Sequence, residues 1–439
     1  MIPLTKMLWI FYLSLILGQE GLLDPAFDRI PFEQWLKGGG EARIRWSTRI
    51  FPSRLTVHQR LETILSVQVD GEEFVKRNGP GQVVVFVEIR GRDNRVYRTH
   101  RPMHFAELKN PSDLASVHFD QYAFITPGDY QVAEAIYDTE SKEHSLKRIK
   151  LHVPGIAHDP LPGSWRDLPE VEFVGVPDPP ERWYLPEIDS RLYLPVENER
   201  PVRVEVVVNE SPTEIVAGRT GRVSRRNMGN LIPALKVLSQ LDIRNGSMNV
   251  TLLDLERRKV SFTQDGVQKL DWMRLRAALL ENDPNQIDVH ALENHEQNAQ
   301  FFVSEVRKRL EGESNGDVPL GLTAEPARVL IVLSGPMAFG KGQDLRPIEA
   351  TPEPGSRVFY IRYYPPLPGV PVVSSVDSRR GRGGTPPVLI RRGSSIRSSI
   401  EDSLEPTLKP LGPRLFNITT PLEFRVALAA IMSEISRLK

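Results

Sequence analysis

Two short polar segments of the sequence carry side chains that bind hard metal ions or other polar ligands. Asn209, Ser211 and Thr213 follow an apolar run at 202–208, and Ser334 follows a second apolar run. Amide and hydroxyl oxygens are ligands for Mg²⁺ and Ca²⁺, but anionic carboxylates supply most of the attraction in sites for these ions. None of these four side chains is a carboxylate, so the chemistry they predict is polar-ligand binding or weak cation binding.

The runs that precede these residues are mostly apolar, with Arg203 and Glu205 in the first and Arg328 at the start of the second, which is typical of parallel strands buried on both faces. Strands are predicted at 202–208, 248–254, 328–333 and 357–363, and helical spacing is present at 231–238, 270–280, 298–310 and 422–438. This alternation indicates a doubly wound α/β fold, in which ligands bind at the carboxyl ends of the strands. We therefore expect Asn209 and Ser334 at one edge of a sheet.

The order of these elements and their polar loops resembles a von Willebrand factor A (vWA) domain, and the whole chain resembles bacterial secreted vWFA-related proteins, in which a β-rich segment precedes that domain. In this family the first strand ends in Asp-x-Ser-x-Ser and the fourth in a loop with another Asp, and together with a Thr they hold a divalent cation. Here Ser211 and Thr213 keep the hydroxyl positions, Asn209 replaces the first Asp, and Gly335 stands where the second is expected. The resemblance implies a degenerate metal site at Asn209, Ser211 and Thr213 with no required cofactor and at most weak Mg²⁺ or Ca²⁺ binding.

Other chemical motifs are incomplete. Glu210 and Glu214 carry carboxylates beside the degenerate motif, but the alternation of side chains along a strand gives no reason to aim either at the site. The run 335–342 nearly fits the phosphate-binding loop, but it ends in glycine instead of Ser or Thr, and prolines interrupt the helix that should follow. His290 and His295 lack the spacing of a zinc protease, and no Gly-x-Ser-x-Gly elbow is present. No catalytic residue is predicted.

The N-terminal half has the pattern of an antiparallel β-sandwich of the immunoglobulin type. Strands are predicted at 60–69, 83–89, 117–125 and 130–137, separated by turns rich in Gly, Pro, Asn and Asp. Tyr130 follows a Pro-Gly turn at 127–128, which fits either a tyrosine corner or a simple hairpin turn.

The predicted organisation has six parts: a signal peptide at 1–18, a helical lead at 19–45, the β-sandwich at 46–153, a strap rich in proline and aromatic residues at 154–200, the vWA-like domain at 201–366 plus 415–439, and a disordered loop rich in Arg, Gly, Pro and Ser at 367–414. The aromatic residues of the strap indicate that it packs along both neighbouring domains. A sugar-binding face remains the alternative for these aromatic residues.

Composition narrows the location and the partners. Lys and Arg together number 56, as do Asp and Glu, so no net charge favours nucleic acid. The sequence has no cysteine, which excludes disulfides and thiolate chemistry. The apolar run at 7–17 predicts a cleaved secretory signal, with an uncleaved anchor as the alternative. We expect a secreted, periplasmic or cell-envelope protein.

The combined patterns favour noncovalent binding of a protein or glycan at the cell envelope, without dependence on a metal. A membrane association would be peripheral, and the arginines of the 367–414 loop suit anionic polysaccharide or headgroups, although a solvated insertion is also open. Two other functions stay open. One is a hydrolase that acts on envelope polymer, and the other is a structural scaffold that binds through the β-sandwich alone.

Overall fold

The computed structural model describes most of the chain outside its termini and several loops. The described residues are 24–38, 44–77, 81–104, 115–174, 184–186, 188–211, 213–216, 222–225, 227–281, 295–311, 326–337, 348, 356–364 and 402–438. The predicted signal peptide at 1–18 lies outside these residues. Among the described residues, no helix is long and apolar enough to span a membrane.

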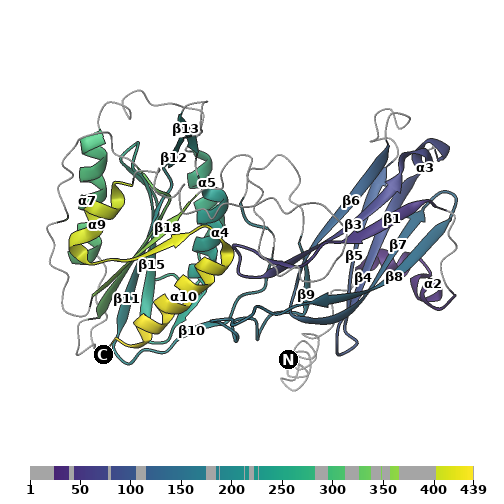
Figure 1. Cartoon of the computed structure of the whole chain (residues 1–439), viewed down its shortest axis with the longest axis horizontal. Coiled ribbons are helices and arrows are strands. Elements are labelled where there is room, and N and C mark those ends of the chain that lie inside the picture. The colour runs from purple at the N-terminus through teal and green to yellow at the C-terminus, as the bar shows by residue number, and fades with distance from the viewer. Residues whose placement is uncertain are drawn as a thin grey trace, which may run out of the picture.

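The chain is a mixed, β-rich multidomain protein with antiparallel sheets and helices, which confirms the prediction at that level (Figure 1). The N-terminal strands are β1 Trp46–Ile50, β2 Arg54–Leu55, β3 Leu61–Asp70, β4 Gln82–Arg90, β5 Val96–His104, β6 Ser116–Ile125, β7 Gly128–Asp138, β8 His144–Val153 and β9 Val171–Val174. They form one sheet in the order β1-β3-β6-β9, with β2 on β3, and another in the order β5-β4-β7-β8. The four strands predicted in this half are β3, β4, β6 and β7, whereas β9 lies beyond the predicted 46–153 limit.

The two N-terminal sheets share one hydrophobic core, to which alternating residues of β3, β4, β6 and β7 contribute. The other face of β4 is also buried, because the 3-10 helix η2 (Pro25–Arg29) and the helix α2 (Phe32–Gly38) cover it with Phe27, Phe32 and Trp35. Burial on both faces explains why β4 is apolar at consecutive positions. A further short helix, α3 (Gly71–Lys76), follows β3.

The turn between β6 and β7 crosses from one sheet to the other. The hydroxyl of Tyr130 donates a hydrogen bond to the carbonyl of Thr126 at 2.9 Å, and Tyr130 is buried. This bond from the tyrosine ring to the backbone of the crossing is the tyrosine corner, one of the two alternatives that the sequence left open.

The C-terminal part is built on a six-stranded sheet with the order β16-β15-β11-β17-β18-β19. Its strands are β11 Val202–Asn209, β15 Gly246–Asp254, β16 Lys259–Gln264, β17 Ala327–Ser334, β18 Arg357–Tyr363 and β19 Arg414–Ile418. All neighbours are parallel except β15 and β16, which form an antiparallel pair. The predicted strands correspond to β11, β15, β17 and β18, and two edge strands were not predicted.

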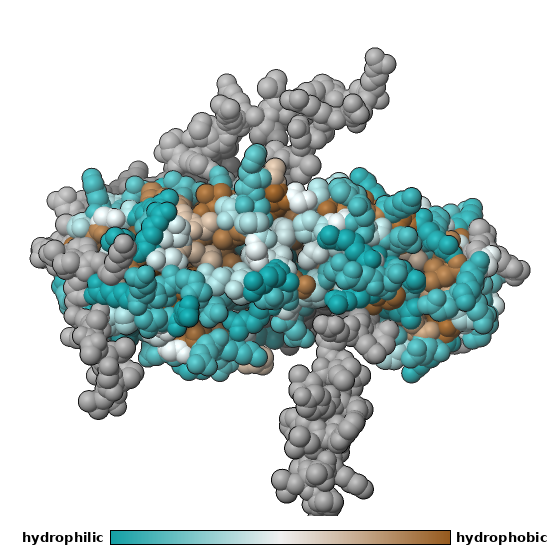
Figure 2. All heavy atoms as spheres, turned by 90° about the horizontal axis from the view of Figure 1, so that it is seen from below, coloured by the Kyte–Doolittle hydropathy of each residue, from teal (hydrophilic) through white to brown (hydrophobic). Residues whose placement is uncertain are grey.

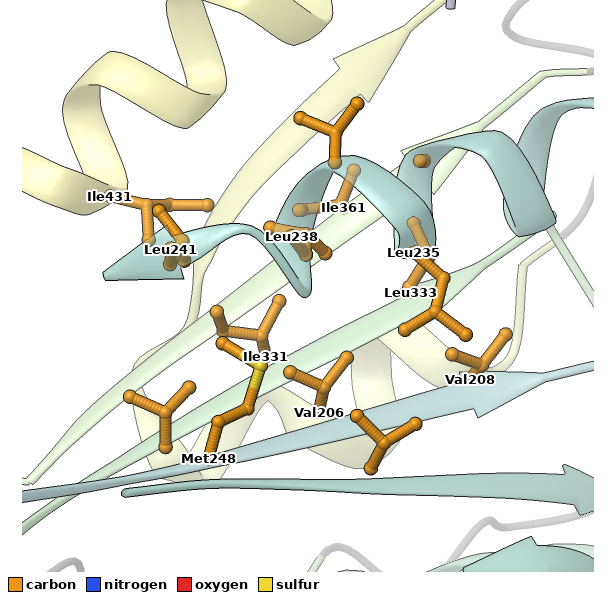
Figure 3. Packing of buried hydrophobic residues seen from close by; sticks show 14 of the residues in the cluster. Val206, Val208, Leu235, Leu238, Leu241, Met248, Ile331, Leu333, Ile361 and Ile431 are labelled. Atoms are coloured by element: carbon orange, nitrogen blue, oxygen red, sulfur yellow. The ribbon is translucent and has the colours of Figure 1, made fainter. Parts of the chain in front are cut away.

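Helices cover both faces of this sheet (Figure 1). They are α4 Met228–Leu238, α5 Trp272–Glu281, α7 His295–Glu311, α9 Leu404–Leu408 and α10 Pro421–Ser436. Residues of α4, α5 and α10 share a core with one face, and residues of α7 and α9 share a core with the other. Figure 3 shows Leu235 and Leu238 of α4 packed over the β11 and β17 side chains, including Val208 and Leu333.

Smaller elements complete this part. The hairpin β12 Thr213–Val216 and β13 Arg222–Arg225 stands apart as a two-stranded sheet, and the strand β10 Leu194–Val196 pairs in parallel with β14 Leu241–Ile243. Because β9 joins an N-terminal sheet and β10 pairs beside the C-terminal sheet, the 154–200 strap contributes a strand to each side.

The predicted disordered loop at 367–414 is wrong in its last part. Residues 402–414 contain α9 and the 3-10 helix η6 (Lys409–Leu411), with Leu404, Leu408 and Leu411 buried in the core beside α7. These three leucines are spaced three or four residues apart, which places them on one helical face. The arginine-rich residues before 402 lie outside the described part.

Candidate functional site

The sequence-predicted site lies where the strand order of the sheet reverses direction. Counted along the chain, the six strands follow the order 3-2-1-4-5-6, and the reversal falls between β11 and β17. Doubly wound sheets bind ligands in the crevice at the carboxyl ends of such strands. Asn209 ends β11 and Ser334 ends β17, so both lie at the carboxyl ends of the strands on either side of this reversal.

A direct hydrogen bond joins these two residues. The Asn209 Nδ2 group donates to Ser334 Oγ at 2.9 Å, and the two residues are 1% and 0% exposed. The Ser334 hydroxyl in turn donates to the carbonyl of Gly335 at 2.6 Å. Both side chains are therefore engaged within the protein at the place where a ligand would approach.

Ser211 is held in the same network. Its backbone N–H donates to Asn209 Oδ1 at 3.0 Å, which forms a local turn of the kind that Asn side chains favour. The Ser211 hydroxyl accepts a hydrogen bond from the backbone N–H of Leu255 at 2.7 Å, and Ser211 is 4% exposed. The hydroxyl thus fastens the loop after β11 to the loop after β15.

For the third predicted ligand, Thr213, the structure describes the backbone alone. Thr213 opens strand β12, where its backbone is paired opposite Arg225 of β13 in the separate hairpin. The side chains of Thr213 and Glu214 lie outside the described residues. The structure consequently brings Asn209 and Ser211 together with Ser334.

Glu210 does not replace the missing aspartates. Its backbone N–H donates to the carbonyl of Leu253 at 2.9 Å, and its carboxylate accepts a hydrogen bond from the hydroxyl of Ser261 on β16. Glu210 is 0% exposed. These contacts direct the carboxylate toward the β15–β16 side of the sheet, whereas Ser334 lies on the β17 side.

Asp402 is the residue of this edge that sequence reasoning missed. Its Oδ1 accepts hydrogen bonds from the backbone N–H groups of Met337 and Leu404, both at 3.2 Å. Its Oδ2 accepts from the Tyr360 hydroxyl at 3.0 Å and from Arg362 at 2.7 Å. Burial raises the pKa of Asp402 above its ordinary value, and the Arg362 guanidinium opposes that shift. With four donors around it, this carboxylate holds the β17 loop to α9.

Met337 connects the two networks, because its sulfur lies 3.5 Å from Asn209 Nδ2 while its N–H is bound by Asp402. No sequence motif marked Asp402, which lies in the segment predicted as a loop. The missed signal was the helical spacing of leucines directly after it.

The other sequence candidates contribute nothing to this edge. His295 begins α7, while His290 and most of the 335–342 run lie outside the described residues. Among the described residues, no group of three or more His, Asp or Glu side chains is arranged to hold a metal ion. The described side chains at these strand ends make hydrogen bonds that hold the neighbouring loops in place.

Comparison with known proteins supplies no family. No protein-family model matches the chain, and no curated protein matches it significantly.

Proposed function

We propose that the protein is a noncovalent binding protein of the secreted or envelope-associated class, with a vWA-like domain that does not depend on a metal. The proposal combines an immunoglobulin-like N-terminal sandwich with that domain. In support, the six-stranded sheet has the strand order of doubly wound folds and helices on both faces.

The observation that carries the proposal is the hydrogen bond between Asn209 and Ser334 at the strand-order reversal. In a metal-dependent vWA domain this position would hold a carboxylate aimed at a cation. Here a neutral amide is bonded to the neighbouring strand, and the Ser211 hydroxyl is bonded to Leu255. The loops of this edge are thereby held without an ion, and a partner would contact a preformed surface.

A capture experiment with the full chain tests this function. The immobilised protein is incubated with envelope extract in parallel samples that contain either EDTA or millimolar Mg²⁺ and Ca²⁺. We expect one specific partner to be retained to the same extent in both samples. Capture that requires the divalent ions, or turnover of added glycan or peptide substrate, would contradict the proposal.

A further inference from the structure

A small hollow lies at the junction of the N-terminal sheets, the strap and the α/β part. Its walls include His58 and Arg60 from the turn between β2 and β3, Ser190 from the strap, and Lys236 and Gln240 at the end of α4. Its empty volume is about 220 Å³, counting the part open to solvent. Three basic side chains from two parts of the molecule thus surround one small space.

One carboxylate near the hollow is already fully engaged. Glu172 of β9 accepts hydrogen bonds from Arg60 and from the Ser190 hydroxyl, and also from the backbone N–H groups of Asp189 and Ser190 at 3.0 and 3.3 Å. Arg60 lowers the pKa of Glu172 despite the opposing effect of burial. The hydrogen bonds of Glu172 thus go to Arg60 and to residues 189–190, and Glu172 acts on Lys236 only from a distance.

Lys236 is the cation of the hollow that has no carboxylate of the described residues in direct contact. Among the described residues its ammonium group has no hydrogen-bond or ion-pair partner, and burial lowers its pKa to about 8. The charged groups that act on it are Glu172, Arg60 and the exposed Asp189. A partly buried ammonium group with no acceptor in contact is less stable than one in water, because the surrounding apolar atoms do not replace its lost hydration.

His58 supplies a second polar group without a partner. Its Nδ1 atom is buried and has no hydrogen-bond partner in the described structure. Burial, together with Lys236 and Arg60, lowers the pKa of His58 to about 4, so the ring is neutral at pH 7. A neutral imidazole can place its proton on Nδ1 and donate a hydrogen bond to an acceptor in the hollow.

We infer that this hollow is a binding site for one small anion of the size of chloride or a carboxylate group, held by Lys236 with a hydrogen bond from His58. The anion supplies a negatively charged acceptor in contact with Lys236 and a hydrogen-bond partner for the buried Nδ1 of His58. Because its ligands come from both sides of the junction, the bound anion also ties the N-terminal sheets to the α/β part. The inference is independent of the function proposed above.

The test follows the melting temperature of the full chain by calorimetry at pH 7. Sodium chloride or sodium acetate is titrated while bulky HEPES salt keeps the ionic strength constant. We expect a saturable rise of about 2–4 °C, since a ligand that binds only the folded state stabilises it. A rise with chloride alone indicates a halide site, and a rise with acetate indicates that carboxylates are accepted. No rise with either salt contradicts the inference.

Single-residue variants test whether the rise in melting temperature depends on Lys236. Lys236→Met is expected to abolish the rise, whereas Lys259→Met, which removes an exposed lysine of β16, retains it. A rise that persists in Lys236→Met overturns the inference. If Lys236→Met does not fold, the wild-type protein is melted at pH 9.5, where Lys236 is neutral. The rise in melting temperature with added anion is expected to disappear at this pH. Persistence of the full rise at pH 9.5 likewise overturns it.

Discussion

Glu134 is a carboxyl group buried between the two N-terminal sheets, and we expect its titration to contribute to the pH dependence of stability. It is 0% exposed, it accepts a hydrogen bond from the Thr48 hydroxyl, and burial raises its pKa to about 7. The unfolded chain releases this proton near the ordinary pKa of 4.5. The stability that the protonated Glu134 contributes to the folded state is thus complete below pH 4.5, and it is lost as the pH rises through about 7.

We predict that Glu134→Gln raises the free energy of unfolding at pH 8 by about 1–3 kcal/mol and changes it little at pH 4.5. The amide keeps an acceptor for Thr48 and has no charge to bury. Urea unfolding at both pH values measures the difference, with the exposed Glu140→Gln as the control. Equal effects of Glu134→Gln at both pH values would refute this explanation.

Asn209 has a structural role at the sheet edge that depends on its amide. Replacement by aspartate introduces the residue that metal-dependent vWA domains have at the end of their first strand, but it removes the Nδ2 donor to Ser334 and buries a charge. We expect Asn209→Asp to lower the free energy of unfolding by about 2–4 kcal/mol without creating a tight metal site. Urea unfolding measures the loss, and Asn94→Asp in an exposed turn is the matched control.

If Mg²⁺ restored the stability of Asn209→Asp, the edge would retain a metal-binding geometry, and the structural interpretation of Asn209 would be wrong. The same result would revive Ser211 as a metal ligand.

At the scale of elements, the closing helix α10 begins with a complete capping box. The Thr420 hydroxyl accepts a hydrogen bond from the N–H of Glu423 at 3.2 Å, and the Glu423 carboxylate accepts one from the N–H of Thr420 at 3.0 Å. We predict that Thr420→Ala lowers the free energy of unfolding by about 1 kcal/mol, because the cap is lost. Thermal melts of the full chain measure this loss. Thr420→Ser keeps the hydroxyl and is expected to unfold like the wild type. A loss in Thr420→Ser as large as that in Thr420→Ala would contradict the capping role.

Long buried elements were predictable from the sequence, and short or edge elements were not. The runs that became β4, β11 and β17 are apolar because both of their faces are covered, and this pattern is local. The edge strand β19 is only partly buried and follows α9, so its pattern is weak. Its pairing with β18 is set by tertiary contacts that no local window contains.

The position of the candidate site could be predicted from the sequence, but the hydrogen bonds within it could not. Asn209 and Ser334 were placed at one edge because each ends a buried strand. Asp402 could not be found in the same way, because its partners Met337, Tyr360 and Arg362 are brought to it by the fold.

At the scale of the whole molecule, a chain of contacts joins the two parts through the strap. Arg425 of α10 is 0% exposed and binds both carboxylate oxygens of Asp159 at 2.6 and 2.7 Å. Its guanidinium lies over the ring of Trp165, which packs against both hydrophobic cores and donates to the carbonyl of Gln59 at 2.7 Å. Gln59 in turn donates to the carbonyl of Pro421 at 3.0 Å.

This junction predicts that the N-terminal sheets and the α/β part unfold together. Arg425→Met leaves the Asp159 carboxylate without its partner, and we expect a loss of about 3–5 kcal/mol and a separation of the single calorimetric transition into two. Arg437→Met, at an exposed position after the same helix, is expected to keep one transition. Two transitions already present in the wild type would contradict the coupling.

The face shown in Figure 2 is mostly hydrophilic with smaller hydrophobic patches. The carboxyl edge of the six-stranded sheet is the surface at which we propose that a partner binds.

Calorimetric titration of the full chain with Mg²⁺, Ca²⁺ and Mn²⁺ tests the central claim most directly, which is that the sheet edge works without a cation. Because Asn209 and Ser211 are bonded within the protein, we predict no binding at micromolar concentrations of these ions. Micromolar binding that is abolished by Ser211→Ala would contradict the claim.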